Sequence, residues 1–244
     1  MTTQSDVDTS RRRFVKGAAI GLALAPGVVM FDLARAKKPD EAVTSAVRWG
    51  LLIDANKCAD CNACVKACNE EHGLVGHGRP QTDPQWIRKV TAKDKQTGHV
   101  MSLPVMCQHC ETPPCEDVCP TGASFKRADG IVLVDKHICI GCRYCMMACP
   151  YKARSFVHEV LTEQKPYSPR GKGTVESCTL CVHRVDAGEL PACVTACNRE
   201  GNKAMVFGDL KDPDSEISQQ LARFGGKQIR ADLGLNTGVR YRGI

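Results

Sequence analysis

The chain has 244 residues and a formal net charge of +6, a surplus too modest to indicate nucleic-acid binding. Hydrophobic residues make up 43%, enough for an ordinary globular core, yet aromatic residues make up only 5% and sixteen residues are cysteines. So many cysteines indicate disulfides or metal centres that replace part of the hydrophobic core.

The N-terminal segment is first basic and then apolar. The stretch SRRRFVK at residues 10–16 matches the twin-arginine pattern of bacterial export signals. Residues 17–33 are too short and too rich in Gly and Ala for a transmembrane span, so we expect a signal peptide at residues 1–36, cleaved after Ala36. The pattern implies export of folded protein to the periplasm. Because folding then occurs in the reducing cytoplasm, the thiols are available there as metal ligands.

The rest of the chain is predicted to form short strands and short helices. Short helices are expected after each cysteine triplet, one amphipathic helix at residues 213–224, and strands at residues 48–54, 86–90, 99–106, 130–135 and 204–210. A Pro/Gly-rich loop is expected at residues 165–173. Its basic residues are either a docking patch or simply solvated, and solvation is preferred for Lys165, Arg170 and Lys172.

All sixteen cysteines fall into four groups of four. They are Cys58, Cys61, Cys64 and Cys68 (group one), Cys107, Cys110, Cys115 and Cys119 (group two), Cys139, Cys142, Cys145 and Cys149 (group three), and Cys178, Cys181, Cys193 and Cys197 (group four). Groups one and three have the spacing C-x2-C-x2-C-x3-C. This spacing puts three thiolates on a tight loop that can surround three irons of a cubane, with the fourth thiolate at the start of a helix.

Two other interpretations fit these cysteines less well. Closed zinc sites take two C-x2-C pairs and have no use for the third and fourth cysteine of such a run. Disulfides need partners at suitable Cα separations, whereas triplets at this spacing crowd one another. Since the cysteines account for every corner of an iron–sulfur cluster, we expect the seven histidines, including His109 and His183, to lie beside the clusters or at the surface.

The segment from group two to group three resembles the middle of a bacterial two-cluster ferredoxin, in which the last cysteine of each run completes the other cluster. The resemblance implies that groups two and three pair, and that groups one and four pair around them. It implies four 4Fe-4S clusters held by Cys58, Cys61, Cys64 and Cys197 (cluster 1), Cys68, Cys178, Cys181 and Cys193 (cluster 2), Cys107, Cys110, Cys115 and Cys149 (cluster 3), and Cys119, Cys139, Cys142 and Cys145 (cluster 4).

The fold expected from this pairing is α+β, with two nested ferredoxin-like lobes. The outer lobe is expected to contain residues 37–103 and 163–210, and the inner lobe residues 104–162. Residues 211–244 are expected to form a C-terminal helix and tail.

Several motifs resemble one protein family over residues 48–210: LPVMCQHCETPPCEDVCPTGA, CIGCRYCMMACPYKAR and GDLKDPDSE. The family is that of the four-cluster ferredoxin-like electron-transfer subunits of bacterial respiratory membrane complexes. Within it, the twin-arginine signal and CPYKARSF are most similar to periplasmic iron–sulfur subunits of the sulfite-reduction-associated Dsr membrane complexes. Group one departs from the pattern only in having Asn69, rather than proline, after its last cysteine.

The resemblance implies an electron relay without a substrate-converting site of its own. Its partners would be a quinone-reactive integral membrane subunit of the NrfD or DsrP type, which attaches it to the inner membrane, and a periplasmic redox protein such as a multihaem cytochrome c. The sequence contains no C-x-x-C-H haem motif and no dinucleotide or triphosphate loop. The alternatives are a beta subunit of a molybdopterin reductase of the polysulfide, tetrathionate or nitrite type, and a structural zinc-binding protein.

Overall fold

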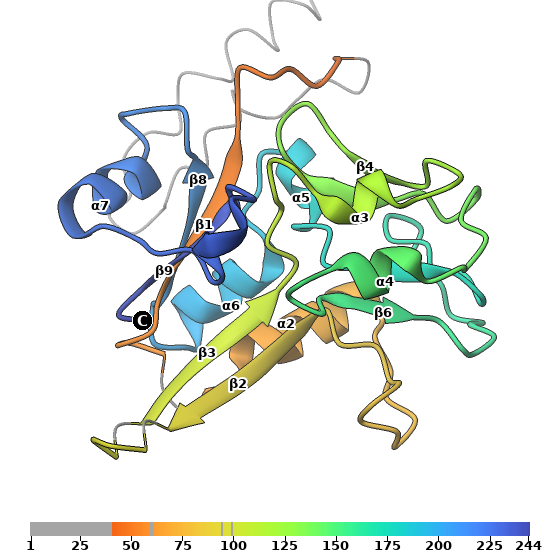
Figure 1. Cartoon of the computed structure of the whole chain (residues 1–244), viewed down its shortest axis with the longest axis horizontal. Helices are drawn as coiled ribbons and strands as arrows, with labels where there is room; N and C mark the ends of the chain where they lie inside the picture. The colour runs from red at the N-terminus through yellow and green to blue at the C-terminus, as the bar shows by residue number, and fades with distance from the viewer. Residues whose placement is uncertain (1–40, 59–60, 94, 99) are drawn as a thin grey trace, which may run out of the picture. The chain divides into compact units, whose positions relative to one another are not determined.

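The computed structural model describes residues 41–58, 61–93, 95–98 and 100–244. The expected signal peptide at residues 1–36 lies outside the described residues. Within them, short helices alternate with strands that pair in small sheets (Figure 1). This architecture agrees with the expected α+β class.

A three-stranded sheet joins three distant parts of the chain. Its central strand is β1 (Trp49–Asp54), which pairs antiparallel with β8 (Met205–Asp209) and parallel with β9 (Val239–Arg242). Leu51 and Ile53 of β1 are fully buried, and the burial of each stabilises the fold by about 2 kcal/mol. The sheet thereby holds the segment before group one against the segment that follows group four.

Helix α7 (Glu216–Phe224) packs against β8 and β1 (Figure 1). It begins after Ser215, whose Oγ accepts a hydrogen bond from the Ser218 backbone N–H at 3.3 Å. Ile217 of α7 is fully buried. A Cβ added at Gly208 of β8 would lie only 2.9 Å from the Cγ2 atom of Ile217. The close approach of helix and strand therefore depends on a glycine at this position.

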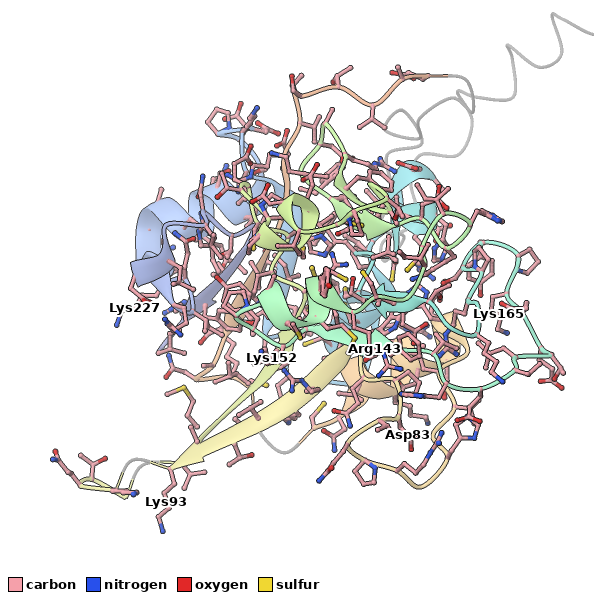
Figure 2. The ribbon with its side chains drawn as sticks, turned by 45° about the vertical axis from the view of Figure 1, so that its right-hand side comes forward. Asp83, Lys93, Arg143, Lys152, Lys165 and Lys227 are labelled. Atoms are coloured by element: carbon pink, nitrogen blue, oxygen red, sulfur yellow. The ribbon has the colours of Figure 1, made fainter. Side chains whose placement is uncertain are left out.

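The longest hairpin leads into group two. It consists of β2 (Ile87–Lys93) and β3 (Val100–Met106), paired antiparallel with Ile87 opposite Met106. Ile87 and Met106 are buried at the inner end, whereas the outer half of β2 is exposed, and Figure 2 shows Lys93 near the tip. Because β3 ends one residue before Cys107, the buried end of the hairpin fixes where group two begins.

Two shorter hairpins and a set of short helices surround the cysteines. The hairpins pair β4 (Ser124–Lys126) with β5 (Val132–Val134), and β6 (Arg154–Phe156) with β7 (Val175–Ser177). The helices are α2 (Ala63–His72), α3 (Pro114–Asp117), α4 (Tyr144–Ala148), α5 (Val182–Asp186) and α6 (Ala192–Arg199), with a 3-10 turn, η2, at Ala231–Leu233. Short helices do occur at every cysteine group, but α2, α3 and α4 begin just before the third cysteine of their groups rather than after it. The fourth cysteines were expected at helix starts and are not there: Cys68 and Cys197 lie within α2 and α6, whereas Cys119 and Cys149 follow α3 and α4.

The helices of the cysteine groups pack in pairs. Helix α2 of group one contacts α6 of group four, and α3 of group two contacts α4 of group three. All described residues nevertheless belong to one compact unit. The division into an outer and an inner lobe, with its boundaries at residues 103, 104, 162 and 163, therefore stays a prediction.

Two further features differ from expectation. After α7 the chain returns as β9, which lies beside β1 and buries Tyr241 completely, so this strand was missed among residues taken as a tail. In the loop at residues 165–173, Arg170 is buried rather than solvated, because its guanidinium forms two hydrogen bonds with the carboxylate of Glu176 at 2.8 and 2.9 Å. Lys165 and Lys172 are exposed, as the preferred interpretation expected.

Candidate iron–sulfur sites

The sixteen cysteines all lie in the described part of the chain, and all are free thiols. Eleven are buried, four are half-buried, and Cys142 is the one that is exposed. A cluster requires such free thiols, since the thiolate is the ligand of iron.

One small cavity is lined by four thiols from the two ends of the chain. They are Cys58, Cys61 and Cys64 of group one and Cys197 of group four. Ile53 at the end of β1 and Met205 at the start of β8 form apolar walls beside them. The three-stranded sheet thus brings the first cysteine triplet to the last cysteine of the chain.

Cys68 lies one helical turn beyond Cys64 on α2 and has a different set of neighbours. Of the thiols that raise the pKa of Cys68, those of Cys178, Cys193 and Cys181 in group four act most strongly, and Cys64 of its own group acts least. The packing of α2 against α6 thus brings the last cysteine of group one close to the triplet of group four.

Groups two and three are interleaved in the same way. Cys107 and Cys110 both have Cys115 and Cys149 among their neighbouring thiols. Cys145 lies near Cys119 and also near Cys115. The packing of α3 against α4 brings these thiols together, and Cys139 and Cys142 lie on the loop that leads into α4.

Backbone N–H groups point at many of the sulfurs. The N–H···S distances are 3.3 to 3.5 Å for the pairs Ala63–Cys61, Ser124–Cys119, Val175–Cys139, Leu180–Cys178 and Ala204–Cys197. Hydrogen bonds to the sulfurs are one of the levers by which a protein stabilises an anionic cluster and sets its potential. The chain therefore supplies donors as well as ligands, and the donor set fits iron–sulfur clusters.

Burial shifts these thiols toward the protonated form in the metal-free chain. It raises the pKa of Cys107 and Cys110 to about 12, and that of Cys64 and Cys181 to about 11. Iron binding must therefore release protons, and a metal-bound thiolate removes the cost of burying an unpaired charge.

Two histidines lie beside the cysteines, as expected, and are held by specific contacts. His72 contacts the Cys181 Sγ through Nε2 at 3.4 Å and the Ser168 Oγ through Nδ1 at 2.8 Å. His109 accepts a hydrogen bond from the Val132 backbone N–H at Nδ1. Both rings are buried, and burial lowers the pKa of His72 to about 4 and that of His109 to about 3. They are neutral neighbours of the sulfurs.

A third polar residue that lies beside the cysteine sulfurs was not identified from the sequence. Arg154 is buried, and its Nη2 donates hydrogen bonds to the Cys115 Sγ at 3.0 Å and the Ser124 Oγ at 2.8 Å. Arg154 lies within the CPYKARSF motif, but its contact with Cys115 joins residues 39 positions apart. No local sequence pattern indicates such a contact. Only the fold brings the two residues together.

The described part of the chain contains neither a site for a single metal ion nor a helix that could span a membrane. No three of its His, Cys, Asp or Glu side chains are arranged to hold one metal ion. None of its helices is long and apolar enough to cross a bilayer.

The sequence matches two models of the 4Fe-4S dicluster domain. One covers residues 53–123 and the other residues 98–210, so together they include every cysteine. Two dicluster domains and sixteen cysteines fit four 4Fe-4S clusters. This result removes the zinc and disulfide interpretations of the cysteines.

Three curated relatives match nearly the whole chain. The "Hdr-like menaquinol oxidoreductase iron-sulfur subunit 1" of Archaeoglobus fulgidus is 42% identical, over 95% of this chain and 97% of the relative. A tetrathionate reductase subunit of Salmonella typhimurium is 36% identical, over 100% of this chain and 92% of the relative. "Protein NrfC" of Escherichia coli K12 is 37% identical, over 92% of this chain and 91% of the relative.

Proposed function

The chain belongs to the 4Fe-4S dicluster iron–sulfur proteins, and on that premise we propose that it is a periplasmic electron-transfer subunit. It relays electrons through four clusters between a quinone-reactive membrane subunit of the NrfD or DsrP type and a periplasmic redox partner such as a multihaem cytochrome c. The observation that carries the proposal is that all sixteen cysteines are free and interleaved between groups, with Cys107 of group two also close enough to Cys178 of group four to raise its pKa.

The ligand sets we propose are the four predicted from the ferredoxin resemblance. The cavity lined by Cys58, Cys61, Cys64 and Cys197 supports the first set, and the neighbours of Cys68 support the second. When bound, each cluster accepts and returns one electron. The residues around it exclude water, hold the cluster in place and donate hydrogen bonds to its sulfurs.

Group three contains the exposed cysteine, Cys142. Around the exposed Cys142 are the large apolar side chains of Ile138, Ile140, Tyr144 and Met147, which are 48 to 69% exposed. Apolar side chains gathered on a surface mark an interaction site more often than chance exposure. A redox partner that covers this surface would come close to the cluster held by Cys142.

The name of one relative supports the quinone partner, and the name of another supports a role in sulfur metabolism. The Archaeoglobus relative is named as a menaquinol oxidoreductase subunit, and the Salmonella relative as a tetrathionate reductase subunit. The Dsr-like motifs, together with the sulfur compound in the name of the Salmonella relative, support a role in dissimilatory sulfur metabolism similar to that of DsrO. The second candidate function is that of a beta subunit serving a molybdopterin reductase, which the Salmonella relative favours.

The test is electron exchange in the detergent-solubilised complex that contains the full chain. After dithionite reduction, we expect a soluble menaquinone analogue to reoxidise the clusters of the complex, and not those of the isolated subunit. Failure of both quinone and quinol to exchange electrons with the clusters contradicts the proposal. Haem c in the purified complex supports the cytochrome partner, whereas molybdopterin in its place identifies the second candidate function.

Export is tested separately. Replacing both Arg11 and Arg12 with lysine should leave a folded, brown precursor in the cytoplasm, because the twin-arginine route requires the pair. Normal amounts of periplasmic protein in this variant contradict that route.

A further inference from the structure

Two arginines in the described part of the chain are buried, and they have different partners. Arg170 is 7% exposed and pairs with the carboxylate of Glu176. Arg154 is 6% exposed, and its hydrogen-bond acceptors are the Cys115 thiol and the Ser124 hydroxyl. Burying a guanidinium away from any anion is costly, so Arg154 requires a negative partner other than a carboxylate.

The neighbours of Arg154 come from two different cysteine groups and two different proposed clusters. Its Nη2 is bonded to the Cys115 Sγ, and Cys107 is also close; both belong to the proposed cluster 3. It also interacts with Cys145, which belongs to the proposed cluster 4. The Nη1 atom is buried and makes no regular hydrogen bond within the described chain.

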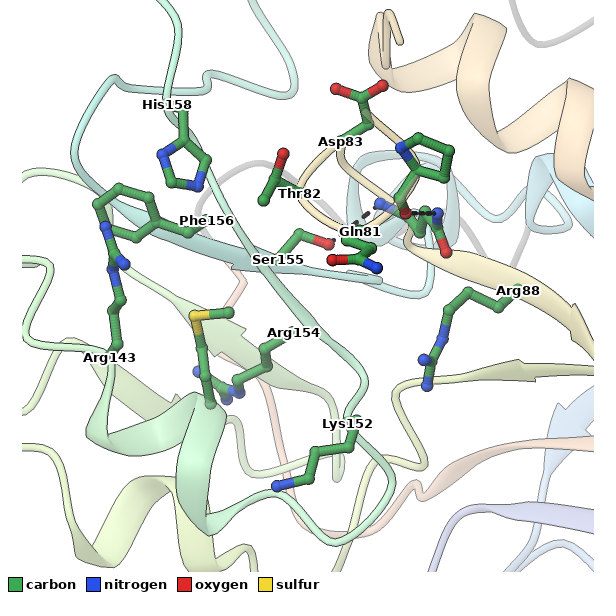
Figure 3. Close-up of a pocket in the computed structure, with 13 residues that line it drawn as sticks. Gln81, Thr82, Asp83, Arg88, Arg143, Lys152, Arg154, Ser155, Phe156 and His158 are labelled. Carbon is green, nitrogen blue, oxygen red and sulfur yellow. Dashed lines mark hydrogen bonds between the residues drawn. The ribbon is translucent and has the colours of Figure 1, made fainter. Parts of the chain in front are cut away.

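The position of Arg154 follows from the fold. It is the first residue of β6, which starts five positions after Cys149, and β6 is pinned to β7 by the pairing of Arg154 with Ser177. Arg154 lines a pocket of about 500 Å³, and Figure 3 shows its side chain between those of Arg143 and Arg88 and above that of Lys152 in this view. Arg154 is the buried member of this basic set, while Lys152 and Arg143 are exposed.

We propose that Arg154 is a shared counter-charge that raises the reduction potentials of two neighbouring clusters, those completed by Cys149 and by Cys119. The inference rests on the ligand sets of the proposed function. Adding an electron makes a cluster more negative, so a fixed cation beside it favours the reduced state. One guanidinium between two clusters favours reduction of both, so it shifts both potentials in the same direction.

A surface lysine cannot do the same. Water screens an exposed charge, and the ammonium of Lys152 is exposed, with only a 3.5 Å contact to the Met147 carbonyl oxygen. Lys152 lines the same pocket as Arg154 and carries the same formal charge. It therefore provides a matched control for removing one positive charge from this region.

The experiment is a redox titration of the four-cluster protein followed by EPR. Cys149→Ser and Cys119→Ser first identify the two signals that belong to the proposed clusters 3 and 4. We expect Arg154→Gln to lower the midpoint potentials of both signals and to leave the other two unchanged. Lys152→Gln should leave all four potentials close to those of the native protein.

Each outcome decides a different part of the inference. A fall in only one signal, or in neither, overturns the shared counter-charge. A fall in two signals other than those lost in Cys149→Ser and Cys119→Ser supports the counter-charge and overturns the ligand sets. If Arg154→Gln loses iron, the Arg154→Lys variant decides the question. Near-native potentials in Arg154→Lys support the role of the charge. Loss of iron in Arg154→Lys as well means that Arg154 is a structural residue, which overturns the proposal.

Discussion

At the scale of single residues, Cys68 shows how one thiol connects two parts of the chain. It lies on α2 one turn beyond Cys64, yet its neighbours are thiols of group four. A lost ligand leaves three thiolates and one iron corner that is no longer held, which often yields a three-iron or labile centre. The damage should therefore appear at the cluster that Cys68 completes, and not at the triplet nearest to it in sequence.

We predict that Cys68→Ser changes the same EPR signal as Cys181→Ser, and that Cys197→Ser changes the signal affected by Cys61→Ser. The measurement is EPR of the four single variants after anaerobic purification, with iron content determined in parallel. If Cys68→Ser instead matched Cys61→Ser, each group would hold its own cluster and the paired sets would have to be abandoned.

The buried ion pair between Arg170 and Glu176 supports a second residue-scale prediction. Glu176 is fully buried on β7, and Arg170 also donates to the Gly73 carbonyl oxygen at 2.7 Å, so the pair ties the loop to the end of α2. Glu176→Gln leaves the guanidinium buried without its anion and should lower the free energy of unfolding by about 3 kcal/mol. Loss of visible cluster absorbance in guanidinium chloride reports the change.

The exposed pair between Arg230 and Asp232 is the control for this prediction. Its two side chains are more than half exposed, and surface pairs contribute little because water screens them. Asp232→Asn should leave the denaturation midpoint unchanged. Equal midpoints for Glu176→Gln and the native protein would show that the buried pair does not hold the loop.

At the scale of elements, the loop of group three depends on close backbone packing. Gly141 has a φ of +69°, and an added Cβ would lie 2.1 Å from the Gly173 carbonyl oxygen in the loop before β7. Since this neighbour is backbone, no side-chain movement relieves the clash. We predict that Gly141→Ala prevents assembly of the cluster held by this loop, so that the iron content falls below that of the native protein.

Gly122 provides the matched control, because it has a φ of +68° and no atom within 4 Å of an added Cβ. Gly122→Ala should cost only the left-handed backbone strain, about 1 kcal/mol, and retain the full iron content. Iron analysis and EPR of the two variants separate the steric effect from the backbone effect. Full iron in Gly141→Ala would show that the loop can move away from Gly173.

The elements also show what the sequence could predict. The cysteine spacing is local, so the four groups and the helices that contain or follow their cysteines could be predicted, as could β1, β3 and β8 from their apolar runs. The strands β6, β7 and β9 are three or four residues long and are fixed by long-range pairing, which leaves no periodic signal. For the same reason the sequence could not predict which sulfurs Arg154 and His72 contact, since these contacts span 39 and 109 positions.

At the scale of the whole molecule, the clusters should reverse the sign of the charge. The chain has a formal charge of +6, and loss of residues 1–36 removes five basic and three acidic groups, which leaves +4. Each oxidised cubane with four thiolates carries about −2, so four of them add roughly −8. The mature holoprotein should therefore carry about −4, and even the uncleaved chain would be acidic at about −2.

We predict that native isoelectric focusing places the oxidised holoprotein well below neutral pH, whereas the sequence alone gives a pI of about 8.6. The control is the same preparation after removal of iron by a chelator under reducing conditions, which restores neutral thiols and should focus at a basic position. A lower isoelectric point of the holoprotein shows that the clusters add negative charge. A holoprotein that focuses together with its metal-free form would contradict the four-cluster content, because no protein residue changes between the two samples apart from the cysteines.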